Sequence, residues 1–122
     1  DTEDATETIV GVTRDPQFGP LVMFGLGGIF VEVLEDTSFR VAPVTEADAR
    51  EMTDEIEAAP LLRGARGREA VDIDAVVDVI QRISQLVTDV PAITELDINP
   101  VVASAEGATA VDLRLTLDQE KL

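Results

Sequence analysis

Two short segments near the start of the chain have the composition of β-strands. Residues 8–13 are mostly β-branched and residues 21–26 are mostly apolar, while Asp, Pro and Gly in residues 14–20 favour a turn between them. This pattern predicts a first hairpin. Residues 38–44 are predicted to form a further strand, whereas residues 29–34 fit either a strand or a short helix, because periodicity does not separate the two.

Two segments in the middle of the chain have helical spacing. Thr45 and Asp48 have the pattern of a capping box, which predicts a helix that continues to about Ala58 and is ended by Pro60. Its inward positions are Ala49, Met52 and Ile56. A second helix is predicted from about Asp72 to Thr88. Its apolar stripe consists of Ile73, Val76, Val77, Ile80, Ile83 and Val87.

Polar and apolar positions alternate most clearly in a pair of segments towards the end of the chain. In the first segment Glu95, Asp97 and Asn99 share one face of a strand, and Leu96 and Ile98 share the other. In the second, the apolar face consists of Val111, Leu113 and Leu115, with Asp112, Arg114 and Thr116 opposite. The alternation predicts a C-terminal hairpin with one polar face.

The turn of this hairpin is predicted at residues 104–107, and the symmetric register sets Asn99 opposite Asp112 and Asp97 opposite Arg114. Opposed residues have Cβ atoms roughly 4.5–5.5 Å apart. The oxygens of Asn99 and Asp112 can therefore reach one Mg²⁺, which takes few protein ligands. The alternative is an edge hairpin with a solvated polar face. Strict alternation also puts Val101, Ala103 and Ala110 on the Asn99 face, which predicts its partial burial.

Both predicted helices lie in long crossovers between strands. We therefore expect an α+β fold, with an antiparallel or mixed sheet and two main helices on one face. Residues 7–117 are expected to form a single domain, preceded by a frayed start at residues 1–6 and followed by a tail at residues 118–122. A chain of 122 residues supports one domain with a modest core.

Composition narrows the classes of function. The absence of Cys and His excludes disulfides, zinc ligation by thiolate or imidazole, and a phosphohistidine within this chain. No apolar run approaches the roughly 20 residues of a membrane span, so we expect a cytoplasmic protein. The net charge of −16 argues against nucleic acid and membranes as partners. A single Lys beside 25 carboxylates suggests a halophilic protein, and an ordinary acidic domain is the alternative.

Two groups of residues are candidates for approaching phosphate. The first is the set Gly25, Gly27 and Gly28. They lack the spacing of a nucleotide-binding fingerprint, so both a structural role and a loop with amides at phosphate remain open. The second is the set Arg63, Arg66 and Arg68. Their mutual repulsion requires nearby anions, either phosphate or the abundant carboxylates. Arg14 has the same ambiguity, while Arg114 is interpreted as an ion-pair partner that orients Asp97.

Three runs together carry a resemblance to a known family. They are Ile9 to Pro20, Phe24 to Ile29, and the Glu-Leu-Asp-Ile-Asn-Pro sequence of residues 95–100. The chain resembles the ATP-grasp domain of ADP-forming acyl-CoA (acetyl-CoA) synthetases over residues 7–117, and more distantly the succinyl-CoA synthetase β subunit. The resemblance implies the C-terminal lobe of an ATP-grasp domain, and the acidic composition suggests a halophilic archaeon as its source.

The resemblance also implies a site. Mg²⁺ and ATP or ADP are the expected cofactors, with Asn99 and Asp112 as metal ligands, Gly27 and Gly28 near the phosphates, and Arg14 as a further cofactor-binding candidate. The implied reaction converts acyl-CoA, ADP and phosphate to acid, CoA and ATP through a phosphohistidine. The expected partners are the rest of the ATP-grasp domain and a CoA-binding subunit or domain that carries the His. No catalytic residue is assigned to this chain, which is expected to be inactive alone.

Two other functions remain open. One is a regulatory ATP-grasp-like module of a multidomain protein acetyltransferase. The other is a binding module without catalysis. Residues beyond the termini would discriminate among them, because an acetyltransferase domain there would exclude the synthetase.

Overall fold

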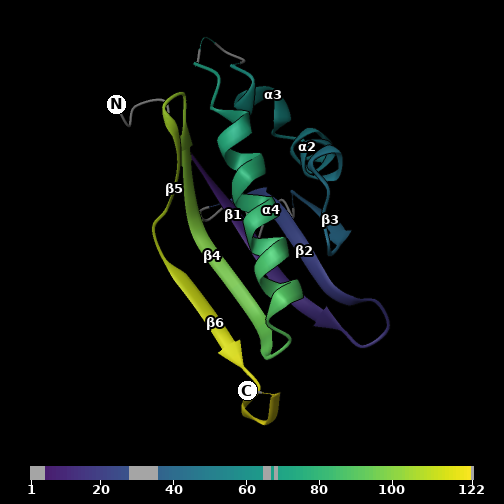
Figure 1. Cartoon of the computed structure of the whole chain (residues 1–122). Coiled ribbons are helices and arrows are strands. Elements are labelled where there is room, and N and C mark those ends of the chain that lie inside the picture. The colour runs from purple at the N-terminus through teal and green to yellow at the C-terminus, as the bar shows by residue number, and fades with distance from the viewer. Residues whose placement is uncertain (1–4, 28–35, 65–66, 68, 122) are drawn as a thin grey trace.

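The computed structural model describes residues 5–27, 36–64, 67 and 69–121. Its six strands form one antiparallel sheet in the order β3-β2-β1-β4-β5, with β6 also paired to β4 (Figure 1). The strands are β1 (Thr6–Asp15), β2 (Gly19–Leu26), β3 (Thr37–Val41), β4 (Ile93–Ser104), β5 (Gly107–Ala110) and β6 (Leu113–Leu117). The predicted α+β fold is confirmed, and so are both predicted hairpins.

Three α-helices lie in the described part of the chain, α2 (Glu46–Glu55), α3 (Ala59–Leu62) and α4 (Ile73–Asp89), followed by a short 3-10 turn, η3 (Gln119–Lys121). The predicted capping box is present, since the Asp48 N–H donates to Thr45 Oγ1 at 3.0 Å and the Thr45 N–H donates to Asp48 Oδ2 at 3.4 Å. The second predicted helix is confirmed as α4, with Asp72 as its N-cap.

The prediction that Pro60 ends the first helix is wrong. Helix α2 ends at Glu55, and Pro60 lies in the first turn of α3, where a helix does not need the missing N–H. Between the helices the buried carboxylate of Asp36 accepts the N–H groups of Glu57 at 2.5 Å and Ala58 at 2.9 Å. These bonds satisfy donors that a continuous helix would use, so the chain breaks there.

The strand predicted over residues 38–44 is shorter than expected, since β3 ends at Val41. The Ala42–Pro43 peptide bond that follows is cis. The alternatives for residues 29–34 lie outside the described residues. No helix in the described ranges is long and apolar enough to cross a membrane.

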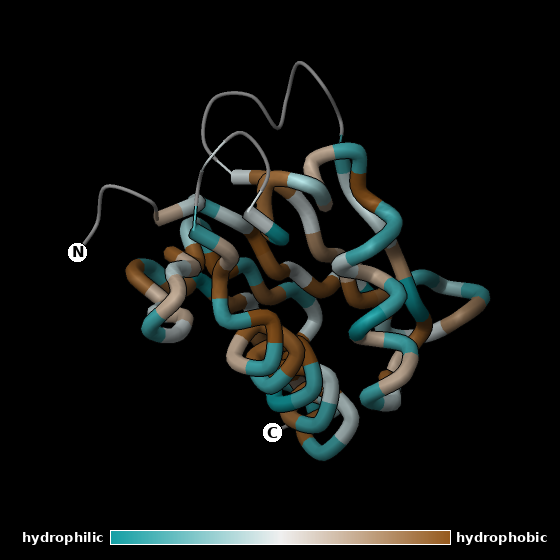
Figure 2. Tube along the Cα trace, turned by 90° about the horizontal axis from the view of Figure 1, so that it is seen from above, coloured by the Kyte–Doolittle hydropathy of each residue, from teal (hydrophilic) through white to brown (hydrophobic). Residues whose placement is uncertain are grey.

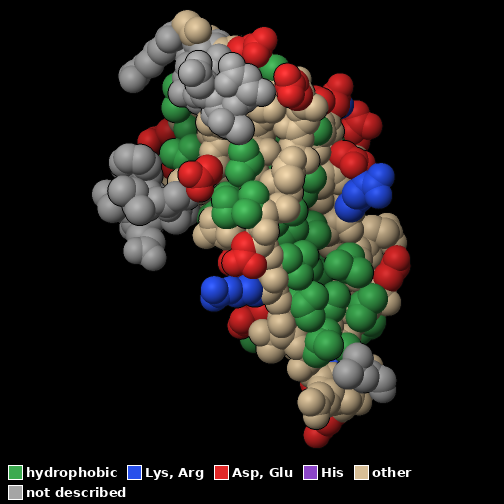
Figure 3. All heavy atoms as spheres, turned by 90° about the vertical axis from the view of Figure 1, so that its left-hand side faces the viewer, with side chains coloured by type: hydrophobic (Ala, Val, Ile, Leu, Met, Phe, Trp, Pro, Cys, Tyr) green, Lys and Arg blue, Asp and Glu red, His purple; other side chains and the backbone are tan. Residues whose placement is uncertain are grey.

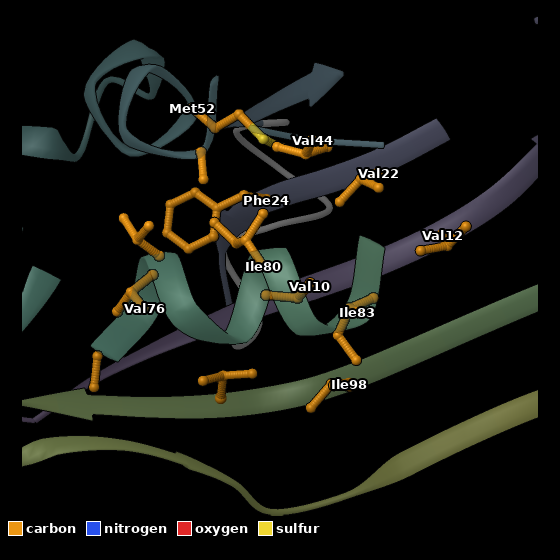
Figure 4. Close-up of a cluster of buried hydrophobic side chains, with 14 of the residues drawn as sticks. Val10, Val12, Val22, Phe24, Val44, Met52, Val76, Ile80, Ile83 and Ile98 are labelled. Atoms are coloured by element: carbon orange, nitrogen blue, oxygen red, sulfur yellow. The ribbon is translucent and has the colours of Figure 1, made fainter. Parts of the chain in front are cut away.

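The core lies between α4, α2 and one face of the sheet (Figure 4). Phe24 from β2, Val10 from β1, Met52 from α2 and Ile80 from α4 are fully buried. In Figure 2 hydrophobic and hydrophilic residues alternate along the strands and helices, as elements with one buried face require. The apolar stripe predicted for α4 is buried, except that Ile73 is only partly so.

The edge strand β6 extends this apolar face beyond the helices. Leu113 and Leu115 lie opposite Ile98 and Leu96, which are buried, yet they are 47% and 42% exposed. Figure 3 looks onto the β5–β6 edge and shows hydrophobic side chains grouped there. The apolar face predicted for this strand therefore exists, but the helical layer does not cover it.

Candidate functional site

The predicted metal ligand Asn99 lies at a kink in β4. Leu96 and Ile98, before it, are buried against the helices, and Val101 and Ala103, after it, are buried as well. Asn99 itself is exposed. Strict alternation would give Asn99 and Val101 the same environment, so the strand changes face between them.

A β-bulge causes the change of face. The register between β1 and β4 shifts at Asn99 and Pro100, which together oppose the single residue Ile9. The Asn99–Pro100 peptide bond is cis. Pro100 has no N–H to donate to a neighbouring strand, and Pro within sheets is confined largely to edges and bulges.

The predicted partial burial of the Asn99 face is therefore wrong. The bulge moves Val101 and Ala103 to the core face and leaves Asn99 on the open face of the sheet. Ala110, which was expected to help bury Asn99, is exposed.

The predicted pairing of the two candidate ligands is confirmed. Strands β5 and β6 are interrupted at Val111 and Asp112, beside the bulge. The Asn99 N–H donates to the Asp112 carbonyl oxygen at 3.1 Å, and the Val111 N–H donates to the Pro100 carbonyl oxygen at 3.0 Å. Asn99 and Asp112 are thus directly opposed across the hairpin, and both are exposed.

Arg114 lies opposite Asp97, as predicted, but its ion pair is a different one. Its Nε is 4.0 Å from Oδ2 of Asp112, and these side chains are 83% and 59% exposed. Residues two apart on a strand share a face, which brings Arg114 beside Asp112. Exposed ion pairs at this distance contribute little to stability. The Asp112 carboxylate stays accessible, because its side chain is more than half exposed.

Glu95 and Asp97 border a shallow hollow of about 170 Å³ on the open face of the sheet. Its other lining residues are Gly11, Val12, Thr13, Leu21, Met23, Phe39 and Leu96. Two carboxylates beside an apolar floor suit a ligand with both a flat apolar part and hydrogen-bond donors.

The glycine segment at the end of β2 lies near the kink. Ile9, which the bulge opposes, pairs on its other side with Gly25. Gly25 of β2, Ile9 of β1, Asn99 of β4 and Asp112, between β5 and β6, therefore form one row across the sheet. Because neighbouring strands are about 4.8 Å apart, the backbones of Gly25 and Asn99 are on the order of 10 Å apart.

Gly25 and Gly27 have structural reasons to lack a side chain. A Cβ at Gly25 would lie 2.7 Å from the Asp36 carbonyl oxygen, and a Cβ at Gly27 would lie 3.1 Å from the Glu7 backbone. The Gly27 N–H donates to the Glu7 carbonyl oxygen at 2.8 Å. The close approaches predicted for these glycines are present. Gly28 lies outside the described residues, and the phosphate role of both members of the pair stays a prediction.

Arg14 lies at the far end of β1 from this row. Its Nε donates to the Ile93 carbonyl oxygen at 2.6 Å, and its Nη2 donates to the carbonyls of Val87 at 2.8 Å and Val90 at 3.4 Å. The guanidinium thus caps the C-terminal end of α4, where a positive charge is favourable. Its predicted part in cofactor binding stays a prediction.

The arginine-rich segment after α3 is only partly described. Arg63 forms an ion pair with Asp54 of α2, so a neighbouring carboxylate supplies its anion. Arg66 and Arg68 lie outside the described residues, and a phosphate-binding role for this segment stays a prediction.

The resolved pKa shifts lie away from the kink. Arg40 of β3 donates to Glu55 Oε1 at 2.9 Å and to Glu51 Oε1 at 3.3 Å. The hydrogen bonds from Arg40 lower the pKa of the Glu55 carboxyl, and the same bonds raise the pKa of Arg40. Hydrogen bonds to Asp74 and Glu46 raise the pKa of Arg50. These pairs brace α2 against β3 and α4.

A family comparison identifies the domain. A model described as an ATP-grasp domain matches residues 1–117. The chain belongs to the ATP-grasp family. The predicted resemblance is thereby confirmed at the level of the domain.

Two curated relatives of this ATP-grasp chain are ADP-forming ligases. It is 58% identical over 111 residues to the β subunit of acetate–CoA ligase [ADP-forming] I of Pyrococcus furiosus, covering 91% of this chain and 48% of that protein. It is 51% identical over 114 residues to acetate–CoA ligase [ADP-forming] I of Archaeoglobus fulgidus, covering 93% and 17%. The chain therefore spans about half, or less, of the curated relatives it matches.

A solved structure has the same fold. An acetyl-coenzyme A synthetase 1 from Ca. Korarchaeum cryptofilum superposes with a TM-score of 0.90 and 50% identity, over 93% of this chain and 53% of that one. That protein was solved with coenzyme A and Mg-AMPPCP, with its phosphohistidine segment pointing towards the nucleotide-binding site.

The donor atoms at the kink of the ATP-grasp chain fit magnesium. Asn99 offers an amide oxygen and Asp112 a carboxylate, which are the hard ligands that Mg²⁺ prefers. In the part of the chain that the structure describes, no cluster of three or more His, Cys, Asp or Glu is placed to hold a metal. A site with two protein oxygens leaves the other positions to water and phosphate, as is usual for Mg²⁺.

Proposed function

We propose that this chain is the C-terminal, magnesium- and nucleotide-binding lobe of the ATP-grasp domain of an ADP-forming acyl-CoA synthetase. The observation that carries the proposal is the direct pairing of Asn99 with Asp112 at the kink, on the open face of the sheet. The identity to ADP-forming acetate–CoA ligases supports the reaction class. It also favours a ligase over a regulatory module of an acetyltransferase.

The chain's own share of the reaction is electrostatic. Bound Mg²⁺ would neutralise the charge that develops between the β and γ phosphates. Asn99 and Asp112 would hold the metal at a fixed separation, because their backbones are hydrogen-bonded to each other. Gly27 and Gly28 would lie near the phosphates, on the glycine segment that starts in the same row of the sheet.

The remaining parts of the reaction belong to partners. The chain has no His, so the phosphohistidine would come from a CoA-binding subunit or domain. The Korarchaeum structure, whose phosphohistidine segment points towards its nucleotide site, supports this arrangement. The rest of the ATP-grasp domain would complete the nucleotide clamp, and we expect the isolated chain to bind Mg·ATP weakly and not to turn over.

Calorimetric titration of the full-length protein with Mg·ATP, together with the coupled acetyl-CoA and ADP assay, tests the proposal. Asn99→Ala and Asp112→Ala should weaken binding and abolish ATP formation. Equal affinity and turnover in both variants would refute the ligand assignment. Acetyl transfer to a protein substrate without ATP formation would instead support the acetyltransferase module.

Two further properties are proposed from composition. The charge of −16 supports a halophilic protein, whose acidic surface stays soluble when salt screens its self-repulsion. The origin in a halophilic archaeon and the cytoplasmic location stay predictions.

A further inference from the structure

The hydroxyl of Thr8 is buried in the sheet, and packing alone does not require a hydroxyl at this position. Thr8 of β1 is fully buried, and its Oγ1 donates to the Val101 carbonyl oxygen of β4 at 2.8 Å. A valine would fill nearly the same volume without a polar group to satisfy. The hydroxyl therefore ties one particular residue of β1 to one particular carbonyl of β4.

This bond lies at the edge of the bulge. Thr8 is paired with Val101, whereas Val10 is paired with Ile98, so β4 has one residue more than β1 in this interval. The pair of Thr8 and Val101 is the first regular pair that follows the extra residue along β4. A side-chain bond at this pair fixes where the bulge ends.

The position of the bulge decides which residues share the open face with Asn99. A slip of one residue moves every side chain beyond it to the other face of the sheet. With the observed bulge Asn99 is exposed, while Val101, which strict alternation would put on the same face, is buried in the core. Pro100 cannot help to hold the register through an N–H, so the Thr8 hydroxyl supplies a contact that the proline lacks.

We propose that Thr8 is a positioning residue for the metal site: its hydroxyl fixes the end of the bulge in β4, which keeps Val101 in the core and off the open face where Asn99 lies beside Asp112. The inference rests on the proposed function of Asn99 and Asp112 as Mg²⁺ ligands. Thr8 is fully buried, and its hydroxyl acts on the site through the β4 backbone.

The test compares Thr8→Val with Thr53→Val in the full-length protein. Thr53 is equally buried, at 1% exposure, and its Oγ1 donates to the Arg50 carbonyl oxygen at 2.7 Å within α2, so the control removes the same kind of bond far from the kink. The readouts are the Mg²⁺ concentration that half-saturates Mg·ATP binding and the thermal midpoint. Thr8→Val should raise the half-saturating Mg²⁺ concentration roughly tenfold. Thr8→Ser, which keeps the hydroxyl, should have nearly the half-saturating Mg²⁺ concentration of the parent. Thr53→Val should leave that concentration unchanged.

A second measurement does not depend on the metal assignment. Hydrogen exchange of the Asn99 and Val111 amides reports the two bonds that flank the kink. Thr8→Val should speed the exchange of these two amides more than that of other β4 amides, and Thr53→Val should not. Unchanged exchange at both amides would overturn the proposal. Equal effects of the two valine variants on Mg²⁺ dependence would also overturn it, provided that Asn99→Ala alters that dependence. If Asn99→Ala leaves Mg²⁺ dependence unaltered while Thr8→Val still speeds this exchange, the metal assignment fails and the bulge-fixing role stands.

Discussion

The backbone N–H of Asn99 donates to the carbonyl oxygen of Asp112 at 3.1 Å, so the two candidate ligands are joined independently of their side chains. Both side chains are exposed on the open face. Truncating either side chain therefore removes an oxygen that could bind a metal, and it leaves the packing and backbone contacts of the kink in place.

Asn99→Ala and Asp112→Ala should accordingly unfold at nearly the same urea concentration as the parent, because exposed substitutions usually change stability by less than about 0.5 kcal/mol. Mg²⁺-dependent nucleotide binding should fall by an order of magnitude or more in each. Asn99→Asp, which keeps an oxygen ligand, should retain metal binding. A large loss of stability in the alanine variants would show that these residues hold the fold rather than the metal.

The glycines allow a sharper comparison within one sheet. A Cβ at Gly25 would meet the Asp36 carbonyl oxygen and Thr37 Cγ2 at 2.7 Å, whereas a Cβ at Gly11 would find its nearest atom, the Leu96 carbonyl oxygen, at 3.4 Å. Gly25→Ala should therefore destabilise the protein by about 1–3 kcal/mol in urea unfolding. Gly11→Ala should change stability by no more than about 1 kcal/mol. Similar losses in both would contradict the close approach of β3 to β2.

Local signals predicted much of this fold. Three features depend on residue spacing that can be read directly from the sequence. They are the Thr45 capping box, the apolar stripe of α4 and the hairpin register across Asn99 and Asp112. The register succeeded because a turn fixes the pairing of the strands on either side of it. The prediction that Asn99 and Asp112 lie together depended only on this register, and it succeeded for that reason.

The errors came from contacts that are distant in sequence. The break between α2 and α3 depends on the buried Asp36 carboxylate, which lies about twenty residues before it. The bulge depends on pairing between β1 and β4, at opposite ends of the chain. One signal could have indicated the bulge, since Pro100 within an otherwise regular strand is itself evidence against strict alternation.

Arg14 should contribute to stability through the end of α4. Its three donor contacts reach carbonyls of Val87, Val90 and Ile93, and hydrogen bonds from a charged group contribute about 1.5–3 kcal/mol. We expect Arg14→Ala to lower the free energy of unfolding by about that amount, and Arg14→Lys to recover part of it by keeping the charge. Urea unfolding measures both.

The same variants test the predicted part of Arg14 in cofactor binding. If Arg14 acts only at α4, folded Arg14→Lys should bind Mg·ATP as tightly as the parent in the full-length protein. A weaker affinity in a protein that is otherwise stable would support the cofactor role.

Acid should weaken the contact between α2 and β3. Because Arg40 lowers the pKa of Glu55 in the folded chain, the ion pair stabilises above the unfolded glutamate pKa of about 4.3 and is lost as pH falls through the lowered folded value. Glu55→Gln should thus reduce the difference between the thermal midpoints at pH 7 and pH 3. The effect should be small, since the Glu55 side chain is 44% exposed. Glu57→Gln, two residues away, is the control and should leave more of the difference intact.

Salt should stabilise this chain rather than weaken it. Screening shortens the range of charge interactions from about 10 Å at 0.1 M to about 3 Å at 1 M salt. It weakens ion pairs such as those of Arg40 and Arg50, but it weakens repulsion among 25 carboxylates opposed by 9 basic residues much more. The thermal midpoint should therefore rise between 0.1 M and 1 M KCl. Replacing the exposed Glu57 and Glu120 with Gln should flatten this rise, because fewer like charges then remain to be screened. A midpoint that falls with KCl would show that the ion pairs outweigh the repulsion, and would remove the physical basis for a halophilic origin.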